Sequence, residues 1–276
     1  MAAAVVGVVV LGAVGTPAVA RGGYPDPTLE LPRMTAPFPG VGPHRPYVQQ
    51  ILIDTVTPLK DGAIINRTSQ GLLFRGGQQN NDLTVTHVEG RLHFVDSGTQ
   101  SWKFLPRGCV RLDVPKGVGA SCRVRNKFTI DEPMLVEVWP RLGNDTVDSS
   151  ALPALFDISF LGDRGDDTAY LGAGDDFVNG AQDNDRVYGG DGHDWLRTGL
   201  GNDFIDGGAD GDYLVGVAGD DTIRGGSGDD RIFGLDGNDE LDAGEGDDRV
   251  SCGLGSDTAS VKSSDRTLDC EAVSRL

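Results

Sequence analysis

Apolar side chains recur at every ninth residue over a long stretch of the chain, from residue 162 to residue 260. The stretch divides without a gap into eleven units of nine residues, and the eighth position of every unit is apolar. A fixed short period of this kind indicates a repeat architecture, in which each unit buries its apolar residue against its neighbours. The residues at position eight are Ala169, Val178, Val187, Leu196, Ile205, Leu214, Ile223, Ile232, Leu241, Val250 and Ala259.

The remaining positions divide each unit into a turn and a strand. Glycine is frequent at positions one, two and four, where it permits the positive φ angles that a tight turn needs. Positions seven to nine are often aromatic or β-branched and predict a three-residue strand. One turn and one strand make half a coil, so that eighteen residues complete a coil and residues eighteen apart stack about 4.8 Å from one another.

Position six is Asp in all eleven units. Stacking at coil spacing brings Asp176 over Asp194 and Asp185 over Asp203, and like charges at that separation repel unless a cation lies between them. Carboxylates and backbone carbonyls are the ligands of Ca²⁺, whereas Zn²⁺ favours Cys and His, and Mg²⁺ keeps its waters. The sequence therefore predicts calcium between the turns.

These residues resemble the RTX, or haemolysin-type, calcium-binding nonapeptide repeat. The resemblance implies an all-β fold, a right-handed parallel β-roll of two short-strand sheets with eighteen residues per coil. It also implies an ion between units i and i+2, which gives nine stacked pairs in eleven units.

The ligand set of one ion follows from the resemblance. The carbonyls of Gly172 and Gly174 with the Asp176 carboxylate face the carbonyls of Gly189 and Asp191 with the Asp194 carboxylate. The same mapping along the block implies the metal ligands Asp167, Asp185, Gly199, Gly201, Asp203, Asp212, Asp221, Gly226, Gly228, Asp230, Asp239, Asp248 and Asp257. Weaker or empty loops are expected where another residue replaces the second or fourth glycine, at Asp163, Ala181, Asp183, Asp210, Val217 and Leu235.

The acidity of the chain lies in the repeat block. Residues 162–260 hold 25 acidic and 6 basic residues, a net charge of −19, and the rest of the chain holds 17 acidic and 18 basic, a net charge of +1. Nothing basic or aromatic-lined indicates nucleic acid. A disordered acidic segment is the alternative, and it would not keep eleven apolar residues in phase. Without calcium, disorder becomes the expected state.

The N-terminal residues indicate export. Residues 1–20 are apolar and end in Ala18-Val19-Ala20, which predicts a secretory signal peptide and an extracellular protein with no membrane span in the mature chain. Residues 21–50 carry seven of the fourteen prolines and predict an extended linker.

Residues 51–140 are strand-like and predict a β-rich cap on the first coil, with a hairpin that turns at Glu89-Gly90. A partial repeat with Asp145 at position six opens segment 141–161, and an insertion then follows; residues 261–276 predict a C-terminal cap. The Gly108-Cys109 pair, followed by Cys122, resembles the N-terminal part of secreted actinobacterial calcium-binding proteins.

Two disulfides are expected from the four cysteines. Cys252 and Cys270 are eighteen residues apart, and stacking would place their Cα atoms near 5 Å from one another, within disulfide range. Cys109 and Cys122 are the remaining pair. Four free buried thiols are the alternative.

Candidate chemistry outside the repeats is sparse. His87 and His93 flank the hairpin turn and could hold zinc with Glu89, although no third ligand is evident; His193, at position five of a repeat, is expected to face solvent. Hydrolase and phosphate-loop motifs are absent from the sequence. The leading hypothesis is a secreted, non-enzymatic calcium-binding β-roll. The alternative is an RTX-type extracellular effector or adhesin that uses the roll as a calcium-triggered folding module.

Overall fold

A computed structural model describes residues 62–275, all within one compact unit that covers Pro37–Leu276. These residues form strands, turns and bends and contain no helix, so none is long and apolar enough to cross a membrane. The predicted signal peptide (1–20), the predicted linker (21–50) and the first residues of the predicted cap (51–61) lie outside the described residues.

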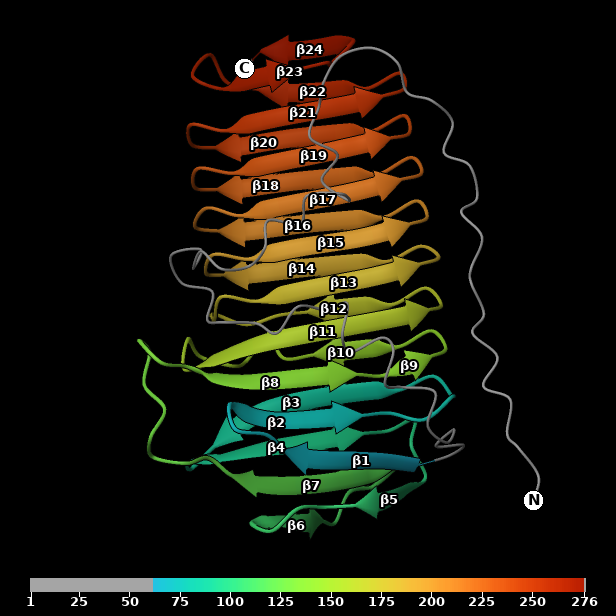
Figure 1. Ribbon diagram of the computed structural model, residues 1–276, viewed down its shortest axis with the longest axis vertical. Coiled ribbons are helices and arrows are strands. Elements are labelled where there is room, and N and C mark those ends of the chain that lie inside the picture. Colours follow the sequence, from blue (N-terminus) through green and yellow to red (C-terminus); the bar gives the residue numbers. More distant parts are fainter. Residues whose placement is uncertain (1–61, 276) are drawn as a thin grey trace, which may run out of the picture. The chain divides into compact units, whose positions relative to one another are not determined.

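Two twelve-stranded sheets stack coil upon coil (Figure 1). Strand numbers rise in steps of two along each sheet through the repeats, because successive strands alternate between the two sheets. The first sheet contains, in spatial order, β23 (Arg266–Leu268), β21 (Arg249–Leu254), β19 (Arg231–Asp236), β17 (Tyr213–Ala218), β15 (Trp195–Leu200), β13 (Phe177–Gln182), β11 (Phe156–Arg164) with β9 (Arg141–Leu142) paired to it, β8 (Met134–Trp139), β2 (Gly71–Arg75), β1 (Gly62–Arg67) and β5 (Ser101–Phe104). The second contains β24 (Ala272–Arg275), β22 (Thr258–Val261), β20 (Glu240–Glu245), β18 (Thr222–Ser227), β16 (Phe204–Ala209), β14 (Arg186–Asp191), β12 (Thr168–Tyr170), β10 (Thr146–Asp148), β3 (Asp82–Val88), β4 (Arg91–Asp96), β7 (Val118–Arg123) and β6 (Cys109–Leu112).

Neighbouring strands of the repeat block are parallel and offset by eighteen residues, as the pairs Leu196↔Leu214 and Ile205↔Ile223 show. The position-eight side chains form one continuous core, in which each is at most 2 % exposed. A single unit contributes one such side chain, and only stacking makes the row continuous. The predicted parallel, two-sheet β-solenoid is therefore confirmed.

Most strands of the block have six residues, where the sequence predicted three. Strand β14, for example, continues from positions seven to nine of one unit into positions one to three of the next. The pairing of β14 with β16 omits Gly189, because its register passes from Tyr188↔Asp206 directly to Gly190↔Gly208. The position-one residue therefore lies at an interruption of the ladder.

Every turn of the block except the one at Gly172 and Gly174 has positive φ at positions two and four, even where glycine is replaced. At position two, Gly190 and Gly226 have φ of 104° and 110°, and Val217 has φ of 109°. A Cβ disfavours positive φ, so these replacements are strained. All six non-glycine residues at positions two and four have positive φ, namely Asp163, Ala181, Asp183, Asp210, Val217 and Leu235.

A β-rich segment covers the first coil. Strands β2 and β3 pair in parallel with β8 and β10 and thus belong to the parallel stack. Antiparallel strands flank them: β1 on β2, and β4, β7 and β6 beyond β3. Phe74, Phe94 and Trp102 pack together in the core of this segment.

The β3–β4 hairpin turns at Glu89-Gly90, as predicted, and both residues have positive φ. It does not bring its two histidines together. His87 pairs with Leu92 and its ring packs against Phe156, whereas His93 pairs with Thr86, so the imidazoles lie on opposite faces of the sheet. The zinc hypothesis is therefore wrong.

The predicted insertion after the partial repeat is short. Val147 pairs with Ala169, 22 residues away, which is four more than the regular eighteen. By Ser159, which pairs with Phe177, the chain is already in the regular register. Residues 159–161, just before the first unit, therefore belong to a regular coil and not to an inserted loop.

Both predicted disulfides are present. Cys109–Cys122 joins β6 to β7, and Cys252–Cys270 closes the C-terminal end with Cα atoms 5.0 Å apart. The last coil, around Cys270, is shorter than the eighteen residues expected. Arg249 pairs with Arg266, 17 residues away, and β22 pairs with β24 at an offset of 14 residues.

Candidate metal centre

The position-six carboxylates form two columns, one along each edge of the stack where the turns lie. Each of these side chains is at most 3 % exposed, although Asp is seldom buried unless it is paired. The first column contains Asp145, Asp167, Asp185, Asp203, Asp221, Asp239 and Asp257. The second contains Asp176, Asp194, Asp212, Asp230 and Asp248.

One oxygen of each carboxylate is held by the backbone of the preceding coil. The amide N–H of Asp167 donates to Oδ1 of Asp185 at 2.9 Å, and that of Asp185 donates to Oδ1 of Asp203 at 2.7 Å. The same bond recurs down both columns. It fixes the rotamer of every column Asp and aims the second oxygen, Oδ2.

The second carboxylate oxygen, Oδ2, differs from Oδ1 because almost all column aspartates leave it without a hydrogen-bond partner. Within residues 62–275, it is buried without a hydrogen-bond partner in eleven aspartates: Asp145, Asp167, Asp185, Asp194, Asp203, Asp212, Asp221, Asp230, Asp239, Asp248 and Asp257. A buried oxygen left without a partner is costly, and natural proteins rarely repeat such an arrangement without a ligand.

The position-one glycines show what Oδ2 faces. A Cβ added at Gly189 would collide with Oδ2 of Asp194 and with the carbonyl oxygen of Gly207, one coil on. Gly207, Asp212 and Gly225 repeat the arrangement. Two acceptor oxygens therefore converge on the same small space, which is an arrangement that a cation would stabilise.

Burial also makes the negative charge of these groups unfavourable in the metal-free fold. Desolvation is the main cause, and it raises the pKa of Asp212 to about 9 and those of Asp185 and Asp221 to about 8. The pKa of Asp194 rises well above its ordinary value, first through burial and then through the charge of Asp176. A bound cation would reverse this effect, because it favours the ionised carboxylate.

The predicted carbonyl ligands differ in whether they already accept a backbone hydrogen bond. The carbonyl of Gly189, at position one, belongs to the interrupted part of the ladder. That of Gly172, at position two, already accepts the N–H of Asp191 at 3.0 Å. A carbonyl oxygen has two lone pairs, so this bond leaves one for a metal.

The position-four carbonyls, such as that of Gly174, lie against the Cα of the next coil at Gly192. Among the described residues, no three His, Cys, Asp or Glu side chains gather in one group. Any ion between two turns must therefore take part of its ligands from the backbone, which suits Ca²⁺ and not Zn²⁺.

Asp176 departs from this pattern at the start of its column. Its Oδ1 accepts the N–H of Ile158 at 2.6 Å, and its Oδ2 accepts the N–H of Gly172 at 3.3 Å. Both oxygens are thus engaged, and the preceding coil presents Ile158 where a further Asp would stand. Asp176 is therefore less suited to a metal than the rest of its column.

Two acidic residues that sequence reasoning missed extend the columns. Asp248 donates its N–H to Oδ1 of Asp265 at 3.3 Å, and Asp257 donates its N–H to Oε2 of Glu271 at 3.0 Å. Asp265 and Glu271 lie 17 and 14 residues beyond their partners, so the nine-residue period does not reveal them. Only the coil-closing contacts place them in line.

A second ladder runs outside the first, at position five. The N–H of Asn184 donates to Asp166 at 3.0 Å, and the N–H of Asn202 donates to Asn184 at 2.8 Å, opposite in direction to the Asp ladder. Asn between the acids reduces repulsion between like charges on this surface. Each turn is thus tied to its neighbours in both directions.

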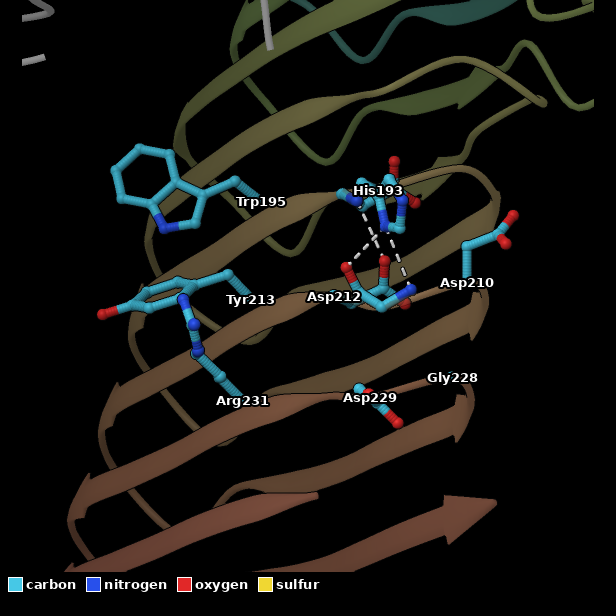
Figure 2. A pocket seen from close by; sticks show the side chains of 10 residues that line it. His193, Trp195, Asp210, Asp212, Tyr213, Gly228, Asp229 and Arg231 are labelled. Carbon is cyan, nitrogen blue, oxygen red and sulfur yellow. Dashed lines mark hydrogen bonds between the residues drawn. The ribbon is translucent and has the colours of Figure 1, made fainter. Parts of the chain in front are cut away.

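On the other edge, position five is occupied by His193 and then by Gly211, which has no side chain to accept a hydrogen bond from the next turn, so the position-five ladder is interrupted there. Figure 2 shows the surroundings of His193. His193 is exposed, as predicted, and its Nδ1 lies 2.9 Å from the Gly211 carbonyl oxygen and 3.1 Å from the Gly211 nitrogen. An open hollow of about 480 Å³ surrounds this contact, with Trp195 and Tyr213 on one side and the exposed Asp229 on another.

Comparison with known proteins agrees with this geometry. A family model described as RTX calcium-binding nonapeptide repeat (4 copies) matches residues 159–187, 188–223 and 224–259. The three matches follow one another without a gap and contain all eleven units except the last residue, Ser260. No curated protein matches the chain at a significant level.

Proposed function

Residues 159–259 of this chain are RTX calcium-binding nonapeptide repeats, and we propose that the protein holds Ca²⁺ ions between successive turns along both edges of its β-solenoid. The observation that carries the proposal is the convergence of two acceptor oxygens, Oδ2 of one turn and the position-one carbonyl of the next, in a buried space. Calcium takes six to eight oxygen ligands in flexible geometry, and it accepts a mixture of carboxylates and carbonyls.

The ions are proposed to be a condition of folding. The block carries a net charge of −19, and each unit buries one sizeable apolar residue, which does not offset the entropy of ordering nine residues. Calcium removes the repulsion and ties each turn to the next. Binding free energy then becomes folding free energy.

A titration of the purified chain tests the proposal. The chain is freed of metal with a chelator and titrated with CaCl₂ in a calorimeter, while circular dichroism follows β structure. We expect several ions per chain and a cooperative gain of β signal in calcium, with little gain at the same concentration of MgCl₂. An unchanged spectrum on chelation, or saturation by fewer than one ion per coil, would contradict it.

We further propose that the protein acts outside the cell as a binding protein and not as an enzyme. Two disulfides join all four cysteines, and such bonds persist in oxidising compartments. The apolar residues 1–20 support the same location. Fractionation of a culture that produces the full chain tests this proposal: the protein is expected in the medium or at the cell surface, with both disulfides intact.

A further inference from the structure

A degenerate repeat lies in the cap, outside the residues that the family model matches. Residues 76–84 read Gly-Gly-Gln-Gln-Asn-Asn-Asp-Leu-Thr and form the turn between β2 and β3. Leu83 pairs with Val147 and is fully buried, as position eight requires, and the offset between these coils is 64 residues. This places Asn81 at position six, directly before Asp145 in the first column.

The backbone of Asn81 behaves as the column aspartates do. Its N–H donates to Oδ1 of Asp145 at 2.5 Å, as the N–H of Asp145 donates to Oδ1 of Asp167 at 2.9 Å. The outer ladder also extends here, because the N–H of Asn144 donates to Oδ1 of Asn80 at 3.2 Å. The turn is therefore built as a member of the column.

The side chain of Asn81 differs in one atom, and that atom changes the chemistry. Its Nδ2 donates to the carbonyl oxygens of Pro140 and Gln79 and to Oδ1 of Asp145, each at 3.0 Å. A Cβ added at Gly76, position one of this turn, would meet Nδ2 of Asn81 and the carbonyl oxygen of Pro140. These atoms stand where the regular turns place Oδ2 and the next position-one carbonyl.

In the space between the turns of Asn81 and Asp145, here called a gap, the Nδ2 donor of Asn81 therefore meets acceptor oxygens. In a regular gap two acceptor oxygens, Oδ2 and a position-one carbonyl, face each other. An amide group supplies two N–H donors and can satisfy three nearby oxygens, with one bond bifurcated. The oxygens that would surround an ion elsewhere are satisfied here by the protein itself.

The next gap, between Asp145 and Asp167, contains an acceptor oxygen that no protein donor satisfies. Asp145 is 1 % exposed, and its Oδ2 has no hydrogen-bond partner within the described part of the chain. Its Oδ1 and backbone N–H are engaged as in the regular repeats. Asp145 therefore offers a buried, unpartnered oxygen in a turn that the family match does not include.

We propose that the calcium column on this edge begins one coil before the matched repeats, at a site between Asp145 and Asp167, and that the amide of Asn81 replaces the ion in the gap before it. The inference rests on the proposed function. It also implies that the first coil closes without metal, so that the cap remains folded in the metal-free chain and presents β8 and β10 for the repeats to stack upon.

Calcium stoichiometry measured by calorimetry on the full chain tests the proposal with three variants. Asn81→Asp is expected to bind one ion more than the parent chain. Asp145→Asn is expected to bind one fewer and to fold, because an amide can close the gap as Asn81 does. Asn80→Asp adds the same charge one residue away, in the outer ladder, and is the matched control, with unchanged stoichiometry.

The outcomes are distinct. A parent chain that binds no calcium contradicts the proposed function itself. A parent chain that binds calcium, with unchanged stoichiometry in Asn81→Asp or in Asp145→Asn, overturns the inference alone. If Asn81→Asp does not fold even in calcium, Asp145→Asn decides. Hydrogen exchange in chelator is the second readout, and equal exchange rates in β2–β4 and in β14–β21 would overturn the metal-free cap.

Discussion

The backbone amide of Asp194 donates to Oδ1 of Asp212 at 2.9 Å, while Oδ2 of Asp194 lies buried without a hydrogen-bond partner. Oδ1 of Asp194 in turn accepts the N–H of Asp176 at 2.8 Å. Each carboxylate thus ties its own coil to the preceding one through Oδ1 and leaves Oδ2 for a cation. Because Asp194 and Asp212 repeat this relationship with their other neighbours, an interior Asp takes part in two gaps, and an Asp at the end of a column takes part in one.

Removal of the charge from an interior carboxylate should therefore affect two ions. We expect Asp212→Asn to lower calcium stoichiometry by up to two, since it adjoins the gaps shared with Asp194 and Asp230. Asp176→Asn, at the start of the same column, should remove one at most, because Ile158 precedes it and both Asp176 oxygens already accept backbone N–H groups. Calorimetric titration measures both, and equal losses would contradict the stacked geometry.

The metal-free chain should gain β structure as the pH falls. The folded-state pKa is raised to about 8 for Asp167, Asp185 and Asp221, against roughly 3.9 for an unfolded Asp. A raised carboxyl pKa contributes stability that is fully present below the unfolded value and is lost as the pH rises through the folded one. Circular dichroism in chelator from pH 8 to pH 4 should show an increasing β signal.

The calcium-loaded chain provides the control for the pH experiment. Protons compete with Ca²⁺ for the same oxygens, so calcium affinity should fall over the range in which the metal-free fold gains stability. A metal-free spectrum that does not change with pH would show that the repulsion and desolvation of these carboxylates do not limit folding.

Loss of the C-terminal disulfide should loosen the last coils first. Cys252–Cys270 closes a loop of eighteen residues, and its removal by Cys252→Ala and Cys270→Ala is expected to cost about 3 kcal/mol in the chain-entropy description. Hydrogen exchange should increase in β21–β24 before it increases in β14–β17. The matched control removes Cys109–Cys122, whose effect should be confined to β6 and β7.

Strain at the replaced glycines should be removable. Val217 has φ of 109°, a conformation in which a β-branched residue costs on the order of 1–3 kcal/mol. Val217→Gly is expected to stabilise the calcium-loaded chain by about 1 kcal/mol, after the entropy that glycine adds to the unfolded chain is subtracted. Thermal unfolding measures the change.

The reciprocal substitution is Gly226→Ala, at the same position of the next unit. A Cβ at Gly226 would collide with the carbonyl oxygen of Gly208, so this variant should be destabilised. If both substitutions shifted the melting temperature in the same direction, positive φ would not be the cause.

The sequence alone determined the regular part of this protein. Leu196 pairs with Leu214 because every regular coil contains eighteen residues. Two nine-residue periods therefore predict directly which residues are in contact. Asp at position six and an apolar residue at position eight were sufficient for the stacked columns of aspartates and for the core. The Cys252–Cys270 pair followed from the same arithmetic.

The tertiary structure decided where the period stops. Asn81, Asp265 and Glu271 join the columns at offsets of 64, 17 and 14 residues, which no fixed period contains. Their places depend on how β4–β7 leave the first coil and return, and on how the last coil tightens around Cys270. Such contacts form between segments distant in sequence, and a local pattern of turns and strands carries no information on the length of the chain that loops out between them.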